Sequence, residues 1–144
     1  MPQPLLPATV TVTIGADVFL ARLRQDLAPR WCQRLKELMP YRGDVIHARW
    51  SGEAIWSPLS SNWQSQAVFP PESPTGRPRS GDVLLFAGSQ SEPELLIAYG
   101  PTRFASKSGA LEGNVVLTID DRHARLAELG REILWRGALR LRIE

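Results

Sequence analysis

The sequence ATVTVTI at residues 8–14 decides the fold class, because apolar and polar side chains alternate along it without interruption. A period of two is typical of a β-strand that buries one face, so the alanine, the valines and the isoleucine are predicted to face a core. A turn follows at residues 15–17, and residues 18–23 are predicted to return as a second strand. The protein therefore opens with a β-hairpin.

Farther along the chain, the patterns predict two helices and six more strands. The first helix has a predicted N-cap at Asp26, carries Pro29 in its first turn and ends at Pro40. The second begins at Asp120 or Asp121 and runs to about residue 135. The further strands are predicted at residues 43–50, 53–58, 82–87, 94–99, 114–119 and 138–144. Helical spacing predicts the outward residues Arg30, Arg34 and Lys36 on the first helix, and the inward residues Leu126, Leu129, Ile133 and Leu134 on the second.

This order of elements does not alternate as in parallel α/β folds. It predicts a mainly β fold, a closed eight-stranded and mostly antiparallel barrel capped by two α-helices, since closure removes exposed strand edges. We expect a single domain over residues 1–144, with an N-terminal tail at 1–7 and a long loop at 59–81. A loop of that length is typical of a lid, an oligomer contact or a disordered segment.

The composition is that of a soluble globular protein, with 43% hydrophobic and 22% charged residues and a net charge of +2. Nearly all of the basic residues are arginines, whose planar forks bind carboxylates and phosphates. Acidic residues are interspersed among them, which argues against nucleic-acid binding. No apolar run is long enough for a signal peptide or a membrane span, so we expect a cytoplasmic protein.

The sequence also lacks several familiar site motifs. It contains no metal-ligand spacing, no phosphate-binding loop and no dinucleotide fingerprint, so we expect neither a metal nor a cofactor. Cys32 is the only cysteine and is predicted to be buried packing rather than a nucleophile.

The stretch IHARWSGEAIW at residues 46–56 contains the first candidate site. A two-residue turn at positions 51–52 would place Arg49 diagonally across from Trp56, with His47 on the same outward face. A guanidinium fork beside an indole forms a binding platform for an anion. The alternative is that this face is only the solvated side of a sheet. Glu53 is a candidate general base, and its alternative role is an ordinary surface carboxylate. The core face is predicted to carry Ile46, Ala48, Trp50 and Ile55.

The loop at residues 99–113 contains the second candidate site. Tyr99 ends a predicted buried strand, and Arg103 and Lys107 follow between glycines at 100 and 109. Two cations on a glycine-flanked loop suit a carboxylate or phosphate ligand. Phe104 is predicted to anchor this loop to the core. Ser106 and Lys107 are adjacent in sequence and would point in opposite directions, which argues against a serine–lysine nucleophile.

Several motifs resemble a family of small bacterial proteins of unknown function with a cyclophilin-like fold. They are DLAP at residues 26–29, IHARWSGEA at 46–54, IAYGP at 97–101, FASK at 104–107 and GN at 113–114. The resemblance spans roughly residues 8–143 and implies an eight-stranded barrel capped by two helices. Compared with that family, this chain carries an insertion at residues 72–79.

True cyclophilins are proline isomerases with a catalytic arginine on the outer barrel face, and Arg49 is similarly placed. The isomerase signature departs at residues 54–56, where this chain has Ala-Ile-Trp, and its downstream motifs are not recognisable. Cyclophilin-like barrels that resemble this one also occur as subunits of enzymes that act on cyclic amides, which favours small-molecule chemistry by analogy.

We therefore expect the protein to bind or act on a small polar anion, a carboxylate or a cyclic amide. The alternatives are a peptide- or protein-binding module and a peptidyl-prolyl isomerase. Enzymatic activity stays open, as a hydrolase or isomerase of a small molecule, and so does homo-oligomerisation. The candidate catalytic residues are Arg49 and Glu53, and the candidate ligand-binding residues are His47, Trp50, Trp56, Tyr99, Arg103 and Lys107.

Overall fold

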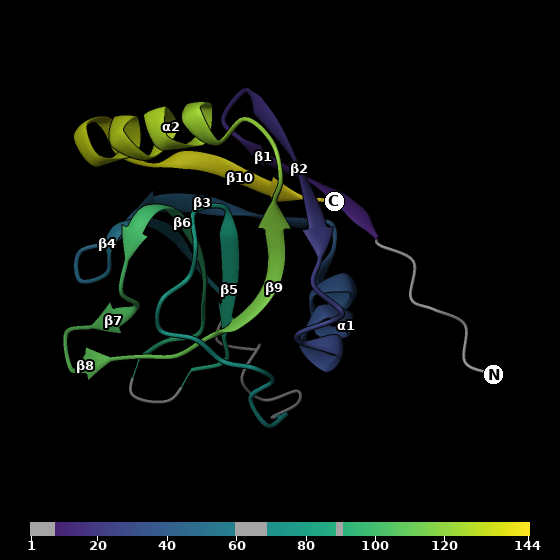
Figure 1. Cartoon of the computed structure of the whole chain (residues 1–144). Coiled ribbons are helices and arrows are strands. Elements are labelled where there is room, and N and C mark those ends of the chain that lie inside the picture. The colour runs from purple at the N-terminus through teal and green to yellow at the C-terminus, as the bar shows by residue number, and fades with distance from the viewer. Residues whose placement is uncertain (1–7, 60–68, 89–90) are drawn as a thin grey trace.

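Eight antiparallel strands close into a barrel in the computed structural model, which describes residues 8–59, 69–88 and 91–144 (Figure 1). Around the barrel the strands follow the order β1-β10-β3-β4-β6-β5-β9-β2. Their bounds are β1 Thr9–Ile14, β2 Asp17–Leu23, β3 Tyr41–His47, β4 Gly52–Pro58, β5 Asp82–Phe86, β6 Glu94–Thr102, β9 Asn114–Ile119 and β10 Leu139–Ile143. The mainly β, closed-barrel prediction is thereby confirmed, as is the opening hairpin, in which Val12 pairs with Phe19.

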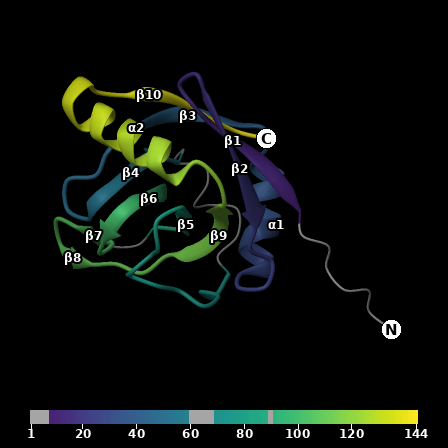
Figure 2. The ribbon, with the colours of Figure 1, turned by 45° about the horizontal axis from the view of Figure 1, so that its top comes forward.

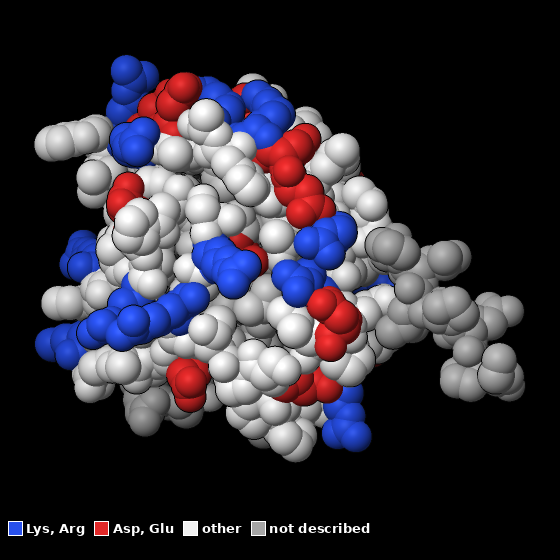
Figure 3. Space-filling view, in the orientation of Figure 1, with Lys and Arg blue, Asp and Glu red and all other residues white. Residues whose placement is uncertain are grey.

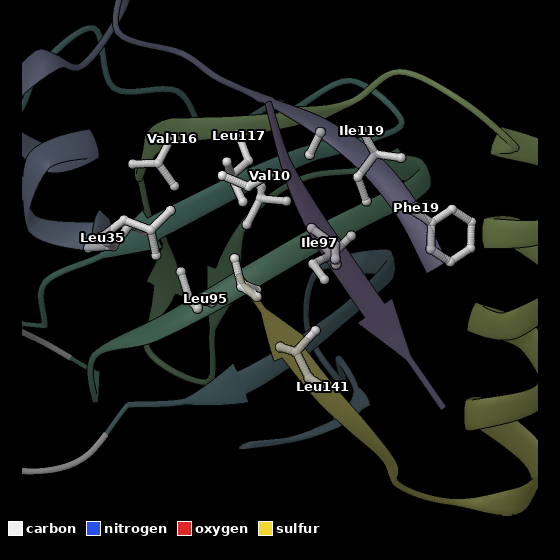
Figure 4. Close-up of a cluster of buried hydrophobic side chains, with 14 of the residues drawn as sticks. Val10, Phe19, Leu35, Leu95, Ile97, Val116, Leu117, Ile119 and Leu141 are labelled. Carbon is white, nitrogen blue, oxygen red and sulfur yellow. The ribbon is translucent and has the colours of Figure 1, made fainter. Parts of the chain in front are cut away.

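The barrel interior is a continuous apolar core. Alternate residues of each strand point inward, as the period-two pattern predicts, and Val12 and Ile14 of β1 are fully buried. Figure 4 shows core side chains such as Val10, Ile97 and Leu117 lying between α1 (Pro29–Leu38) on one side and α2 (His123–Arg136) on the other. Figure 2 shows α2 lying across the barrel near β3, β4 and β6.

The first helix is capped differently from the prediction. Its N-cap is Ala28, and the Glu72 carboxylate accepts hydrogen bonds from the backbone N–H groups of Arg30 and Trp31 at 2.9 and 3.0 Å. Asp26 instead forms an ion pair with Arg24 at 2.9 Å. A carboxylate distant in sequence therefore satisfies the free N–H groups that a local cap would otherwise bind.

The second helix also begins without a side-chain cap, at Arg122. The Asp120 carboxylate pairs with Arg22 at 2.8 Å, and Asp121 accepts the backbone N–H of Leu20 at 3.0 Å. Both aspartates therefore fasten the helix start to β2 instead of capping it.

Two predicted helix faces need correction. Leu134 is exposed. The buried face of α2 consists of Leu126, Leu129 and Ile133, and Leu134, one residue after Ile133, lies outside that face. Arg34 is buried rather than solvated and pairs with Glu37 at 3.0 Å. An arginine can bury its aliphatic stem in this way while its charged end keeps a partner.

A second, smaller apolar cluster lies on the outside of the barrel. A two-stranded ribbon, β7 (Ala105–Ser106) and β8 (Gly109–Ala110), projects beyond β6 (Figure 1). Phe104 is fully buried beneath it and contacts Phe86 edge to face, with the ring centroids 5.4 Å apart. The prediction that Phe104 anchors this loop is confirmed.

Part of the predicted long loop, residues 60–68, lies outside the described residues. The rest is fastened to the barrel. The Trp31 indole donates to the carbonyl of Pro70 at 3.0 Å, and Thr75 forms a β-bridge with Gly113. The predicted insertion therefore includes both the carboxylate that caps α1 and a strand contact. In the part of the chain that the structure describes, no helix is long and apolar enough to cross a membrane.

Ion pairs gather where α2 meets the β1–β2 turn. The Asp17 carboxylate accepts hydrogen bonds from Arg122 at 2.8 Å and Arg125 at 3.0 Å. Arg125 also pairs with Glu128 and Glu132 at 3.0 and 3.3 Å. We call these five residues the α2 network. Figure 3 shows acidic and basic side chains lying beside one another over α2.

Candidate functional site

The floor of the candidate site is a row of three apolar side chains on the outer barrel face. Ile46 of β3 pairs with Trp56 of β4, and Trp56 pairs with Leu96 of β6. Their neighbours Ile55 and Ile97, also paired, point into the barrel core. Because successive residues of a strand face opposite sides, the row at 46, 56 and 96 must face outward.

This register corrects the predicted hairpin. His47 lies opposite Ile55 rather than Trp56, so the strand pairing is shifted by one residue. The shift turns Ile46 outward, although it was predicted for the core, and it also exposes Trp50. The cause is the connection, which uses residues 48–51 instead of a two-residue turn.

Gly52 is required where it stands. Its φ of +96° lies in the left-handed region, and a Cβ there would approach the carbonyl oxygen of Pro101 to 2.9 Å. The glycine therefore lets the start of β4 lie directly against β6.

Two loops form the walls of the site. The β3–β4 loop stands on one side and the β7–β8 ribbon on the other, and together with the floor they enclose a cavity of about 410 Å³, hereafter the pocket. The Ser51 hydroxyl joins the two walls, since it donates to the carbonyl of Ala105 at 3.1 Å and accepts the N–H of Ala105 at 3.0 Å. The backbone N–H of Arg103 adds a bond to the Ser51 carbonyl at 2.9 Å.

Charged side chains of both signs line the pocket. Arg49 from the β3–β4 loop and Lys107 from the β7–β8 turn are exposed, and we call them the pocket cations. Glu92 and Glu94, from the start of β6 and the residues before it, are the pocket carboxylates. Among the described residues, no ion pair joins a pocket cation to a pocket carboxylate.

Glu94 is the most unusual of these groups, because its side chain is buried and only 8% of the residue is exposed. Burial, reinforced by the negative charge of Glu92, raises the pKa of Glu94 to about 7. A carboxyl group with that pKa exchanges its proton near neutral pH and can serve as acid or base.

Five of the eight residues predicted for the site line the pocket: His47, Arg49, Trp50, Trp56 and Lys107. The structure therefore brings together one cation from each of two stretches that are far apart in sequence. Whether these five residues bind a ligand stays a prediction.

Tyr99 lies just behind the pocket. Its hydroxyl is 2.7 Å from Nε2 of His47, and Nδ1 of His47 lies 2.8 Å from the carbonyl oxygen of Ala48. A carbonyl oxygen only accepts, so Nδ1 carries the proton and the Tyr99 hydroxyl donates to Nε2. Burial raises the pKa of Tyr99, with a smaller contribution from Glu53. Tyr99 thus orients a pocket residue without lining the pocket.

Arg103 and Glu53 are not among the residues that line the pocket. Arg103 lines a separate, more open cavity of about 620 Å³ together with Arg77 and Glu112. Glu53 packs against β6, where its carboxyl carbon would lie 2.9 Å from a Cβ built on Gly100. Arg103 and Arg49 therefore line different cavities.

Sequence reasoning missed both pocket carboxylates. For Glu94 the sequence did contain a usable signal. This residue begins an apolar run and lies two positions before Leu96, so both side chains must point to the same outer face of β6. Glu92 precedes a proline in the connection between β5 and β6, and the sequence around it has no periodicity from which its position could be predicted.

The remaining reactive side chain does not contribute to this site. Cys32 is fully buried in α1, its thiol donates to the carbonyl of Val116 at 3.4 Å, and burial raises its pKa to about 11. The thiol is therefore protonated and unreactive at neutral pH.

Known proteins share this architecture. No curated protein matches the chain. A solved structure of McbB in complex with tryptophan superposes with a TM-score of 0.73 at 18% sequence identity, over 94% of this chain and 44% of the McbB chain. The chain thus spans less than half the length of McbB, and at this identity the likeness shows a common fold. Residues 10–144 match the model of a family described as "Protein of unknown function (DUF3830)", and the chain belongs to that family.

Proposed function

We propose that this protein binds a small polar anion, a carboxylate or a cyclic amide, in the pocket between the β3–β4 loop and the β7–β8 ribbon. The observation that carries the proposal is the pair of pocket cations, which come from two different loops and face one cavity over an apolar floor. Neither cation forms an ion pair with a described acidic side chain. Unpaired cations beside apolar surface are the usual means by which a protein orients a carboxylate.

The size of the pocket supports a small ligand. Cavities that hold small molecules usually measure roughly 300–1,000 Å³, and a pocket of about 410 Å³ lies near the lower end. Ser51 fixes the two walls to each other, so little ordering is needed on binding. McbB, whose fold is similar, was solved with a small aromatic amino acid, which is consistent with this role.

The fold within which we place this site is the cyclophilin-like barrel. Its eight closed strands and two capping helices agree with that architecture, and Arg49 lies outside the barrel, as the isomerase arginine does. If the protein is an enzyme, Glu94 is better placed than Glu53 for proton transfer, because it lines the pocket.

The test is isothermal titration with indole-3-propionate as the anion. Arg49→Ala and Lys107→Ala should each weaken binding roughly tenfold or more, the usual cost of losing a hydrogen bond to a charged partner. Arg103→Ala is the matched control, since it removes a neighbouring arginine that lines the other cavity, and it should leave the affinity unchanged. Equal affinities in all four proteins would refute the anion site.

A peptide-binding role is the second candidate, and the exposure of Trp50 favours it. This indole is 58% exposed at the edge of the pocket, where an extended peptide would pass. The probe is a proline-containing tetrapeptide capped at both ends. Because it carries no carboxylate, titration with it separates peptide binding from anion binding. Binding that Trp50→Ala abolishes and Arg49→Ala spares would favour the peptide, and an isomerisation assay on the same peptide would test proline isomerase activity.

A further inference from the structure

The pocket contains a separation of charge that an anion alone does not explain. The pocket cations are exposed at the outer edge, on the two wall loops, whereas Glu94 is buried at the floor beside Leu96. The positive and negative groups therefore occupy different parts of one cavity.

Among the residues that the structure describes, Glu94 has no side-chain partner. Its backbone pairs with Pro58 of β4 and Phe86 of β5, and its side chain shares the outer face with Leu96. Among the described residues, no hydrogen bond or ion pair reaches its carboxyl group, although only 8% of the residue is exposed. Its oxygens are not among the described buried side-chain atoms that lack a partner, so the carboxyl group reaches the pocket, where a donor from outside the chain can approach it.

We propose, building on the anion site above, that the ligand is a small dipolar molecule whose anionic group lies at Arg49 and Lys107 and whose ammonium or N–H group lies at Glu94. Such a ligand satisfies both ends of the pocket at once. The apolar row of the floor, with Trp56 at its centre, then contacts the ring or chain that joins the two groups.

This assignment gives the binding a defined dependence on pH. A cationic group prefers the ionised form of Glu94, so affinity for a dipolar ligand should rise as pH increases through about 7. The other titratable groups that face the pocket are Glu92, His47 and the pocket cations. Both ring nitrogens of His47 already have hydrogen-bond partners inside the protein.

The experiment compares three probes that share an indole ring, which suits the apolar floor, and differ in which charged groups they carry. L-tryptophan carries both groups, indole-3-propionate only the carboxylate and tryptamine only the ammonium. At pH 8 we expect tryptophan to bind at least roughly tenfold more tightly than either partial probe, because one additional charged contact has about that effect.

Variants locate the two ends of the ligand. Glu94→Gln keeps the shape of the side chain and should abolish the advantage of tryptophan over indole-3-propionate. Arg49→Ala should weaken both carboxylates and leave tryptamine unchanged. Glu112→Gln is the matched control, because this exposed carboxylate lines the other cavity, and it should change each affinity by less than about threefold.

The outcomes separate this inference from the anion site. If indole-3-propionate binds the unmodified protein as tightly as tryptophan does, the dipolar ligand is refuted and the anion site stands. If none of the three probes binds, both are refuted. A second measurement needs no variant: tryptophan affinity that stays flat between pH 5.5 and 8 would also overturn the role of Glu94.

Discussion

The α2 network and the pocket use the same kinds of side chain in opposite ways. In the network, Asp17 accepts from two arginines, and Arg125 reaches two further carboxylates. In the pocket, a similar number of charged side chains line one cavity, and among the described residues no ion pair joins a pocket cation to a pocket carboxylate. Charges that hold elements together satisfy one another, whereas charges that lie unpaired around a cavity are available to a ligand.

The difference also affects stability in opposite directions. Arginine hydrogen bonds lower the pKa of Asp17, so its ionised form favours the folded state. Burial raises the pKa of Glu94, so its ionised form disfavours the folded state. A fold that keeps such a group is less stable at neutral pH than it would be without it, which is a common cost of a functional site.

The largest expected effect comes from Gly130→Ala, at the contact between the two regions. A Cβ at this position of α2 would lie 2.4 Å from two carbons of the Tyr99 ring, whose hydroxyl holds His47. We expect the free energy of unfolding to fall by about 3 kcal/mol, the upper range for overpacking, as measured by urea denaturation. The double variant Gly130→Ala, Tyr99→Leu should lose less than the sum of the single variants, and strict additivity would argue against the clash.

The next largest effect is stabilisation by Glu94→Gln at high pH. The pKa of Glu94 rises from 4.5 to about 7 on folding, so its contribution to stability is full below pH 4.5 and is lost as pH rises through 7. At pH 8 the variant should be more stable than the unmodified protein by about 2–3 kcal/mol, and near pH 4.5 the two should be equal. Thermal unfolding of both proteins across this pH range measures the difference in stability. Glu112→Gln should show no such trend, because Glu112 is exposed and lines the other cavity.

A smaller loss is expected from Asp17→Asn in the α2 network. Its pKa is lowered from 3.8, so its contribution is present above that pH and is lost as pH falls below it. At pH 7 the variant should lose about 1 kcal/mol of stability, as is typical for an exposed network of ion pairs, and at pH 2 the difference should vanish. Asp44→Asn is a suitable comparison, since its pair with Arg140 is 3.7 Å long and well exposed. A similar loss in both variants would show that the α2 network contributes no more to stability than an isolated surface ion pair.

The smallest expected effect on stability comes from Arg49→Gln. Arg49 is exposed and pairs with no described carboxylate, so its removal should change the free energy of unfolding by no more than about 0.5 kcal/mol. Urea denaturation checks this, with Arg125→Gln as the destabilising counterpart. A loss from Arg49→Gln as large as that from Arg125→Gln would erase the distinction between the two regions.

Periodicity was enough to predict that the fold is built on half-buried strands, because alternation along β1 and β10 depends on which side faces the core and not on connections. It was not enough for the register between β3 and β4. A strand pair shifted by one residue keeps its alternation, and the shift here follows from a connection that is longer than the shortest turn. Residues 46 and 47 therefore exchanged faces relative to the prediction.

The candidate site was predicted in part for a similar reason. Arg49 and Lys107 were recognised as cations on two loops, and the Ser51 hydroxyl joins those loops across a distance that no local pattern encodes. Arg103 lies on the same segment as Lys107, yet the ribbon turns between them and directs the two side chains to different cavities. Glu94 was missed because a glutamate at the edge of an apolar run looks like the end of that run.

The fastening of the β7–β8 ribbon at Ser51 has a consequence for how this protein can diversify. The floor of the pocket belongs to barrel strands whose inner faces form the core, but the turn at residues 107–108 contributes no side chain to either apolar cluster. Mutations in this turn can change which ligand fits the pocket without disturbing the packing of the barrel core. Members of one lineage can thus acquire different ligands while they inherit the same scaffold.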